Sequence, residues 1–325
     1  WEREYETLLP EGTPYVKPKG ETESGYAGGH YTAYMFVHDV KAADLKDEPY
    51  FISYTVTEEG VGKNAGINIF GTNTEGEIMM GKAPSMRATR KSTAYDLNDQ
   101  ADDYTMDKMV LRREGENLTS CFVTLMEPFS DKYKAYVRNV ERLNINGLHE
   151  FDVAVKVTGE GFTDYIFSAF EEDLDVTVDG IRFQGQFGYV RIQDGKVVLL
   201  QGVDANVLTY GNASLSENRS VTGIVTDVLA KSEGDDRNGF VLDVKPDEGL
   251  KGKYIIVKHP DKTYTGYLIT EIVEKDGRTV ADIGNAEPGF AFTGENRTKM
   301  TYYPQLEREG ITEFVIEDVQ TYKGQ

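Results

Sequence analysis

Short apolar segments separated by tight-turn dipeptides constrain the fold of this chain more than any other sequence feature. Valine alternates with other residues between Phe151 and Thr158, and a period of two is typical of a half-buried strand. Hairpin-type dipeptides separate segments of this kind at Asn146-Gly147, Asp179-Gly180, Asp194-Gly195 and Asp276-Gly277. Such pairs adopt the left-handed backbone angles that two-residue hairpins need. No long apolar stripe with helical spacing occurs, so we predict an all-β chain with few and short helices.

The order of the segments predicts two domains. Strands are expected over residues 31–37, 50–57, 67–70 and 106–112, and a hairpin over residues 181–192 and 197–201. A polar, turn-rich stretch follows at residues 210–220, and short apolar runs with charged turns continue to the C-terminus. We therefore predict a large antiparallel β-sandwich over residues 1–215, followed by a small β-sandwich or barrel domain over residues 216–325.

The most apolar run of the chain extends from Leu118 to Met126. Its near-continuous apolar character predicts a strand buried on both faces. Glu127-Pro128 is expected to end it, and a second strand is expected over residues 133–143. Cys121, the only cysteine, lies within this run, so no intrachain disulfide can form, and we expect a small buried apolar side chain.

The charge of the chain limits its partners. Its 55 acidic and 35 basic residues give a net charge of −20. Nucleic acid is disfavoured because phosphate binding needs a basic face. No apolar run approaches the roughly 20 residues that cross a bilayer, so a membrane is not expected as a partner. The chain opens at Trp1 without a methionine, and we expect a piece of a longer, secreted or cell-surface bacterial protein.

One basic segment interrupts this acidic chain. No acidic residue occurs between positions 81 and 95, where the sequence holds Lys82, Arg87, Arg90 and Lys91. Arginine forks onto carboxylate or sulfate and lysine supplies a point charge, so these four residues are candidates for binding an anionic sugar. The alternatives are a solvated loop or ion pairing with the acidic residues at 96–107. A second basic set follows, and strand alternation would spread it over both faces of a sheet: Arg112, Arg113, Arg138 and Arg142.

Two histidines flank one predicted strand. His30 and His38 are eight residues apart, an even spacing that places both side chains and that of Tyr34 on the same face. A set of this kind is suited to acid–base chemistry or to holding a ligand, which makes the three residues catalytic candidates. The alternative is the polar outer face of an edge strand.

Metal and sugar sites leave weaker patterns. The loop SEGDDRNG, residues 232–239, is the best candidate for a structural calcium ion, with Asp235 and Asp236 as ligands, although it lacks the EF-hand order of ligands. The alternative is a solvated acidic loop. Aromatic rings often bind sugars, but the chain has one Trp, and most of its 20 Tyr and 15 Phe are expected in strand interiors. This composition argues against a dedicated carbohydrate-binding module.

Several segments together resemble one protein family. They are GGHYTAYMFVH, GEIMMGKAP, LRREGENLTSCFVTLMEPF with VERL behind it, GFTDYIFSAF, and FQGQFGYVRIQDGKVVLLQG. Residues from about 28 to about 210 thus resemble the β-sheet region of heparinase II/III-type polysaccharide lyases, and residues 221–325 look like the small β domain that ends some longer members.

The resemblance implies a fold and an activity. Such lyases pair an (α/α) toroid with a large antiparallel sheet domain and cleave uronic-acid polysaccharides by β-elimination. A Tyr or His removes the C5 proton, and a polar or cationic neighbour neutralises the carboxylate. The toroid residues and the His-x-His or His-x-Asp motif of the first sheet strands have no counterpart in this chain, so no catalytic role carries over to His30 or His38.

The expected function follows from the part of the family that the chain resembles. We expect a C-terminal β portion of a polysaccharide lyase acting on alginate- or heparin-type substrates. This portion would be non-catalytic or partly catalytic, and inactive alone. It would wall the cleft for an acidic polysaccharide and support a toroid supplied by the same protein or by a second chain. One alternative is a free-standing carbohydrate-binding module for acidic glycans. Another is a calcium-stabilised structural or surface protein with no ligand.

Overall fold

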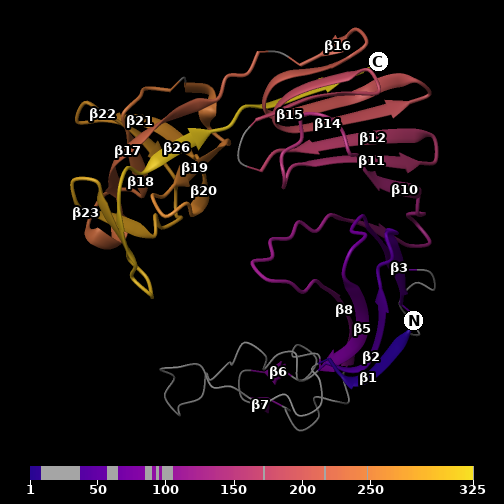
Figure 1. Ribbon diagram of the computed structural model, residues 1–325. Coiled ribbons are helices and arrows are strands. Elements are labelled where there is room, and N and C mark those ends of the chain that lie inside the picture. Colours follow the sequence, from indigo (N-terminus) through magenta and orange to yellow (C-terminus); the bar gives the residue numbers. More distant parts are fainter. Residues whose placement is uncertain are drawn as a thin grey trace. The chain divides into compact units, whose positions relative to one another are not determined.

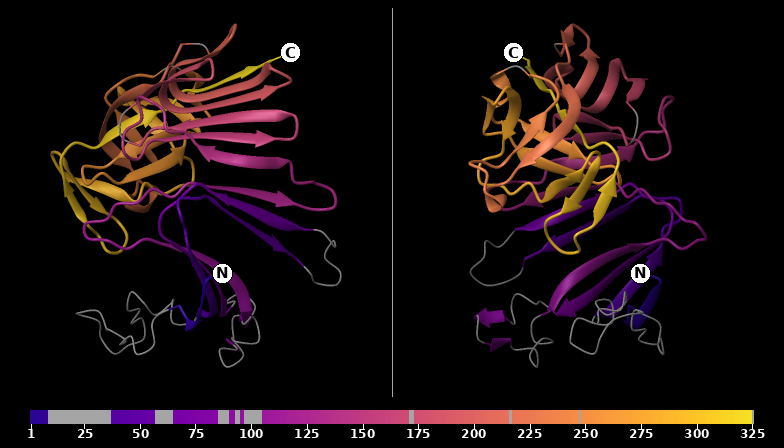
Figure 2. Two further views of the ribbon diagram at one scale, coloured as in Figure 1. Left: turned by 45° about the vertical axis from the view of Figure 1, so that its right-hand side comes forward. Right: turned by 90° about the vertical axis from the view of Figure 1, so that its left-hand side faces the viewer.

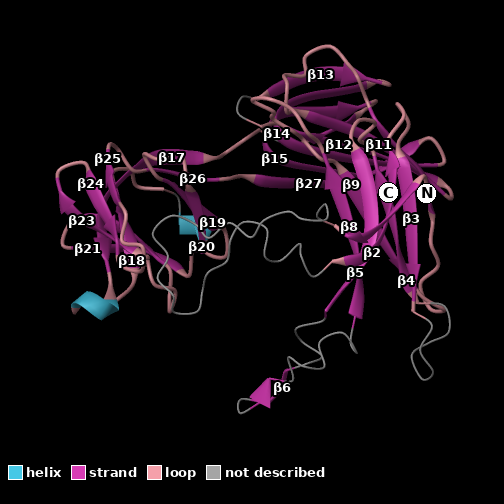
Figure 3. Ribbon diagram, turned by 60° about the horizontal axis from the view of Figure 1, so that its bottom comes forward, coloured by secondary structure: helices cyan, strands magenta, loops and turns pink. Residues whose placement is uncertain are grey.

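The structure, a computed structural model, describes residues 1–8, 37–56, 65–84, 90–92, 95–96, 105–170, 173–215, 217–246 and 248–324. These residues form antiparallel strands joined by turns and loops, with two short 3-10 turns and no α-helix among them. Figure 3 shows this directly, since strands fill the picture and the helix colour marks only short turns. The predicted all-β, sandwich-type fold is confirmed. No helix of the described residues is long and apolar enough to cross a membrane.

The chain divides into two compact units, Trp1–Glu141 and Arg142–Gln325. The predicted boundary between residues 215 and 216 lies inside the second unit, between two sheets that have separate apolar clusters. Strand β10 (Val137–Arg142) spans the division between the units in the sequence.

The first unit is a two-layer sandwich (Figure 1). One layer is a four-stranded sheet in the order β1 (Arg3–Thr7), β2 (His38–Asp44), β5 (Glu77–Pro84) and β8 (Thr105–Arg112). The other is a three-stranded sheet in the order β3 (Tyr50–Thr55), β4 (Gly66–Gly71) and β9 (Thr124–Phe129). A two-stranded pair, β6 (Arg90–Ser92) with β7 (Tyr95–Asp96), completes the described strands of this unit before β10.

Alternating apolar side chains hold the two layers together. Ile52 of β3 and Ile69 of β4 are buried against Ile78 of β5, with Met109 and Leu111 of β8 packed around them. Isoleucine suits this interface because its branched side chain packs well on a pleated surface. The same alternation sends every second residue of β3 and β4 to the opposite, outer face of the small sheet.

A row of charges crosses one end of the four-stranded sheet. Arg3 donates to both oxygens of Asp44 at 3.0 and 2.6 Å, and to Glu77 at 2.7 Å. Glu77 also accepts from Arg112 at 2.5 Å, and only 12% of its side chain is exposed. Each of the four strands thus contributes one charged side chain, and charge-assisted bonds of this kind fix strand positions.

The second unit begins with a sheet in the order β11, β12, β14, β15 and β16, with β13 paired to β14 and β27 to β15. Figure 2 shows its long strands side by side. The bounds are β11 Val153–Gly159, β12 Phe162–Ser168, β13 Leu174–Val178, β14 Ile181–Gln193, β15 Lys196–Tyr210, β16 Ala213–Ser214 and β27 Val319–Lys323. Its core holds the stacked rings of Phe167 and Phe183, whose centroids are 5.2 Å apart.

The remaining strands of the second unit curl around a separate core. Seven of them form one antiparallel sheet in the order β20 (Tyr264–Leu268), β19 (Tyr254–Lys258), β26 (Glu313–Ile316), β17 (Val221–Leu229), β18 (Gly239–Leu242), β22 (Arg278–Asp282) and β21 (Glu271–Lys275). Strands β23 (Phe290–Gly294), β24 (Arg297–Met300) and β25 (Glu307–Glu309) form a smaller sheet. Phe240, Phe290 and Phe314 are buried at the centre.

Three of the four predicted turn dipeptides join neighbouring strands. Asp179-Gly180, Asp194-Gly195 and Asp276-Gly277 connect β13 to β14, β14 to β15, and β21 to β22, and all six residues have positive φ. Two successive positive angles match the type I′ hairpin turn. Asn146-Gly147 differs, because it lies in the longer connection before β11.

The predicted buried strand over Leu118–Met126 is wrong. Residues 118–123 carry no strand, and β9 instead runs from Thr124 through Glu127-Pro128 to Phe129. Leu118 is 41% exposed and Cys121 is half-buried rather than buried. Strand β9 is the edge of its sheet, where a proline that lacks an N–H is tolerated. Glu127-Pro128 is therefore part of the strand and does not end it.

The alternation in β11 buries both faces. Ala154 is fully buried in the apolar cluster of the sheet, while Val155 and Val157 are buried on the opposite face. Lys156 lies on the same face as Ala154, with its ammonium 2.8 Å from Asp179 and over the ring of Tyr165. The half-buried strand that the valine pattern predicted is thus covered on both sides.

Candidate functional site

Two aromatic rings lie side by side on the outer face of the small sheet. Phe51 of β3 and Phe70 of β4 are direct cross-strand neighbours, with ring centroids 4.9 Å apart and planes tilted by 53°. Their position follows from alternation, because Ile52 and Ile69 take the inner face. Phe51 remains 57% exposed. The pair forms an apolar platform that is open to solvent.

Glu127 holds the segment that leads into β10 beside these rings, and this segment forms the wall of the site. It is opposite Asn68 in the register of β9 with β4, and it accepts a hydrogen bond from the Asn68 amide at 3.3 Å. Its other oxygen accepts from the backbone N–H groups of Tyr136 and Val137, at 2.6 and 2.8 Å. One carboxylate therefore fixes the chain that leads into β10 against the outer face of the small sheet.

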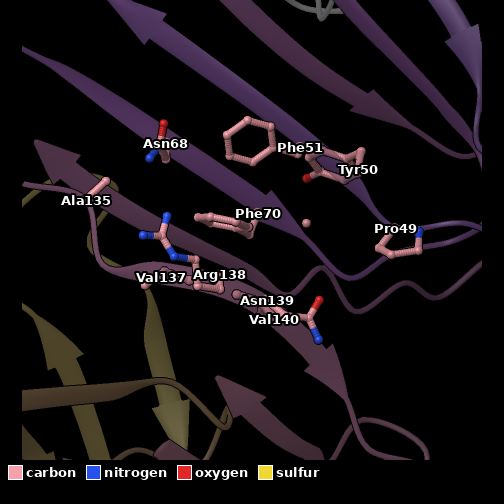
Figure 4. A pocket seen from close by; sticks show the side chains of 11 residues that line it. Pro49, Tyr50, Phe51, Asn68, Phe70, Ala135, Val137, Arg138, Asn139 and Val140 are labelled. Atoms are coloured by element: carbon pink, nitrogen blue, oxygen red, sulfur yellow. The ribbon is translucent and has the colours of Figure 1, made fainter. Parts of the chain in front are cut away.

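The platform and this wall enclose a cavity of about 400 Å³, which we call the aromatic pocket. Figure 4 shows the rings of Phe51 and Phe70 and the guanidinium of Arg138 lining the same space. The residues that complete the lining are Pro49, Tyr50, Asn68, Gly71, Ala135, Val137, Asn139 and Val140. All eleven lining residues belong to the first unit.

The chemistry of the aromatic pocket suits a sugar acid. Exposed aromatic rings offer an apolar surface on which the C–H face of a pyranose ring can lie, with burial of apolar area as the driving force. The amides of Asn68 and Asn139 can both donate to and accept from hydroxyl groups. The Arg138 guanidinium matches the planar, bidentate geometry of a carboxylate.

The sequence-predicted basic residues are described only in part. Lys82 is exposed on β5, opposite Asp107 of β8. Arg87 lies outside the described residues, and Arg90 and Lys91 belong to β6, with side chains that the structure does not describe. An anionic sugar held by these four residues stays a prediction.

His38 lies beside Lys82, because β2 pairs with β5 at this position. Its Nδ1 is 3.2 Å from Asp39. The hydroxyl of Tyr54 is buried and has no hydrogen-bond partner among the described residues, and burial, with the nearby charge of Asp107, raises the pKa of Tyr54. A tyrosine of this kind is a poor general base at neutral pH, because its phenolate is disfavoured.

The other two catalytic candidates, His30 and Tyr34, lie outside the described residues. Their shared face with His38 stays a prediction.

The predicted calcium ligands make contacts within the protein. Asp235 accepts a hydrogen bond from the N–H of Ala230 at 2.9 Å, and Asp236 pairs with Lys275 at 2.6 Å. Within the described parts of the chain, no group of three or more Asp, Glu, His or Cys side chains is placed to hold a metal ion. Calcium at residues 232–239 stays a prediction.

Phe51 and Phe70 were not among the site residues predicted from the sequence, and Arg138 was assigned to no site. The signal was present, because residues 50–54 and 67–70 are apolar at almost every position. When the isoleucines of such a strand face the core, the phenylalanines between them must point outward.

No family model matches the chain, and no curated protein matches it.

Proposed function

We propose that this chain binds an acidic polysaccharide in the aromatic pocket. The observation that supports this proposal is the arrangement of Phe51, Phe70 and Arg138 around one cavity of sugar size. Pockets of about 300–1,000 Å³ are typical for small ligands, and a volume of about 400 Å³ suits one or two sugar rings of a longer polymer. Lys82 and the basic residues that follow it would extend the contact to further anionic groups of the polymer.

In the proposed role the chain is the β portion of a secreted or cell-surface polysaccharide lyase of the heparinase II/III type. Its outer face would wall the substrate cleft, and an (α/α) toroid from the same protein or from a second chain would supply the base. The sequence segments quoted above favour this role. We expect the isolated chain to release no unsaturated uronate from alginate or heparin, as measured by absorbance, and release of the product would contradict this part of the proposal.

The second candidate is a free-standing binding module for acidic glycans. The aromatic pocket favours it to the same degree, because binding there needs no residue outside Trp1–Glu141. The two candidates share the binding site and differ in whether cleavage accompanies it. Adding an (α/α)-toroid polypeptide, from the same protein or from a second chain, distinguishes them, since only the lyase portion would then support β-elimination.

Affinity electrophoresis tests the shared part of the proposal. Gels containing alginate, pectin, hyaluronan or heparin should retard the protein on at least one polymer, and a neutral dextran gel should not. Phe51→Ala and Arg138→Gln should each reduce retardation, because one removes half of the platform and the other removes the cation. Phe122→Ala and Arg297→Gln are matched controls, at exposed positions outside the aromatic pocket.

The outcomes are separable. Loss of retardation in both pocket variants but in neither control supports the aromatic pocket. Equal retardation of all variants would show that the polymer binds outside the aromatic pocket. An Arg87→Ala, Arg90→Ala double variant then tests the basic segment. No retardation on any acidic polymer overturns the proposal.

A further inference from the structure

A second cavity, of about 410 Å³, lies on the outer face of the curled sheet in the second unit. It is lined by Tyr254 and Ile256 of β19, by Gly266 of β20, by Glu317, which follows β26, and by Val319 of β27. Gly252 and Lys253, which precede β19, complete the lining. Its volume is close to that of the aromatic pocket, yet it shares no residue with it. We call it the Glu317 pocket.

The hollow depends on a missing side chain. Gly266 is the direct neighbour of Ile256 in the β19–β20 pairing. Any other residue at this position would place a side chain beside Ile256, on the same face of the sheet. A Cβ at Gly266 would meet only Cδ1 of Tyr254, at 4.0 Å. The glycine therefore opens space over Ile256, and a larger residue there would fill the cavity without striking the backbone.

The rim of the Glu317 pocket is apolar and partly aromatic. Tyr254 is 59% exposed and Val319 is 61% exposed. An exposed aromatic ring attracts cations to its face. Together with Ile256, these side chains supply the apolar contact that a compact organic ligand needs.

The carboxylate of Glu317 forms no ion pair with a described residue, although the charge of Lys258 lowers its pKa. Lys253 forms an ion pair with the neighbouring Asp318 instead, because its Nζ lies 3.1 Å from Asp318 Oδ1. Asp318 also accepts from the N–H of Arg219 at 3.0 Å and from Gln320 at 3.1 Å. No hydrogen bond or ion pair of the described residues reaches Glu317. A half-buried carboxylate without a direct ion pair favours a cationic ligand.

We propose that the Glu317 pocket binds a small organic ammonium ion, with its charged nitrogen on the Glu317 carboxylate and its apolar body against Tyr254, Ile256 and Val319. Charge complementarity identifies the class of ligand. A neutral ligand of the same shape would leave the carboxylate unpaired, and an anionic ligand would be repelled by it.

The groups around Glu317 predict how binding depends on pH. Burial, and then the charge of Asp204, raise the pKa of Glu317, while Lys258 lowers it, and the adjacent Asp318 is already paired with Lys253. A bound ammonium favours the ionised carboxylate. Affinity should therefore be constant near neutral pH and fall as the solution becomes acidic enough to protonate Glu317.

The test compares cyclohexylamine with cyclohexanol, which have similar shape and differ in charge. Titration of the whole chain at pH 7.5, followed by NMR shifts or by calorimetry, should show binding of the amine at least about tenfold tighter than of the alcohol. Glu317→Gln should abolish this preference, and Gly266→Val should abolish binding of both compounds. Glu313→Gln removes a charge from β26, the strand before Glu317, at a position outside the pocket and should leave the preference intact.

Three results of the titrations at pH 7.5 would overturn the proposal. They are equal binding of the two compounds, an unchanged preference in Glu317→Gln, and no binding of the amine up to its solubility limit. If circular dichroism shows that Glu317→Gln fails to fold, two other measurements still test the proposal. They are the loss of amine binding by the unaltered chain at acidic pH and the loss of binding in Gly266→Val. An affinity that rises as pH falls would also contradict it.

Discussion

At the scale of single residues, a few polar side chains set the geometry of the candidate site and the core. Glu127 is the clearest case, since its two oxygens accept three hydrogen bonds and join Asn68 to the backbone of Tyr136 and Val137. A charged acceptor of this kind contributes more than a neutral one. The wall of the aromatic pocket therefore depends on one carboxylate that does not itself line the cavity.

Replacement of Glu127 by glutamine should weaken both the fold and the pocket. The amide keeps the shape but loses the charge, so the free energy of unfolding of the first unit should fall by about 1–3 kcal/mol. Urea denaturation measures this loss, and hydrogen exchange should accelerate at the N–H groups of Tyr136 and Val137. The exposed Glu116→Gln is the matched control and should leave both unchanged. Unaltered exchange at Tyr136 and Val137 would contradict the anchoring role.

His259 makes the stability of the second unit depend on pH. The residue is 6% exposed, and its Nδ1 has no hydrogen-bond partner in the described parts of the chain. Its ring packs edge-to-face on Phe290, with centroids 4.8 Å apart. Burial, and then the charge of Arg308, lower the pKa of His259 below its ordinary 6.5, against an opposing effect of Asp261. The folded chain thus favours the neutral ring, and the unfolded chain takes up the proton first as pH falls.

Stability from His259 should therefore be present above about pH 6.5 and decline below it, until the folded ring is also protonated. The urea midpoint of the unaltered chain, measured between pH 7.5 and 5, should fall more than that of a His259→Phe variant. Carboxylates titrate in both proteins, so the difference between the two curves isolates the histidine. Parallel curves would rule out this role of His259.

At the scale of elements, turn chemistry and alternation predicted much of the fold, because both act locally. The Asp-Gly pairs form the hairpins that their sequence favours, and the strands at residues 50–55 and 66–71 lie where apolar alternation placed them. The apolar run at Leu118–Met126 led to a wrong prediction of strand bounds, because a strand extends only as far as it has a partner to pair with. β4 ends at Gly71, opposite Thr124, so residues 118–123 have no partner strand there.

The aromatic pocket was harder to predict than the strands, for a related reason. Phe51 and Phe70 are far apart in the sequence, and only the β3–β4 register places their rings together. Arg138 reaches the same cavity because Glu127 anchors its segment, a contact that spans ten residues and follows no short motif. Sites assembled by register and by side-chain anchors leave no local pattern in a single sequence.

The long β14–β15 hairpin contains an irregularity that requires glycine. The register shifts between Gln184 and Gly185, where Gly185 has a φ of 148° and a Cβ would lie 2.3 Å from the carbonyl oxygen of Asp204. Gly195, in the turn of the same hairpin, also has a positive φ, of 75°, but nothing lies within 4 Å of its Cβ position. A side chain at Gly195 would therefore cause backbone strain alone, whereas one at Gly185 would also clash with a neighbouring strand.

Alanine at these positions should have unequal effects. Gly195→Ala should cost about 1–2 kcal/mol, the usual penalty for a left-handed non-glycine residue. Gly185→Ala should cost clearly more, because the backbone must also move away from Asp204. Chemical denaturation of the two variants measures the difference. Equal losses would show that the irregularity relaxes without cost.

At the scale of the whole molecule, an acidic chain is proposed to bind an acidic polymer. The net charge of −20 opposes such an encounter, so attraction must be local. The aromatic pocket meets this condition by combining an apolar platform with Arg138. Long-range repulsion is screened by salt more than contact within the pocket, so moderate salt should weaken binding less than it does for a basic glycan-binding protein.

Binding of a size-defined acidic oligosaccharide tests the central claim most directly. Calorimetric titration should use an oligomer of whichever polymer retards the chain in gels. It should give a Kd that rises about tenfold in Phe51→Ala and in Arg138→Gln, a loss of about 1.4 kcal/mol for each, with the Phe122→Ala and Arg297→Gln controls unchanged. A Kd that is the same in all five proteins would contradict binding in the aromatic pocket.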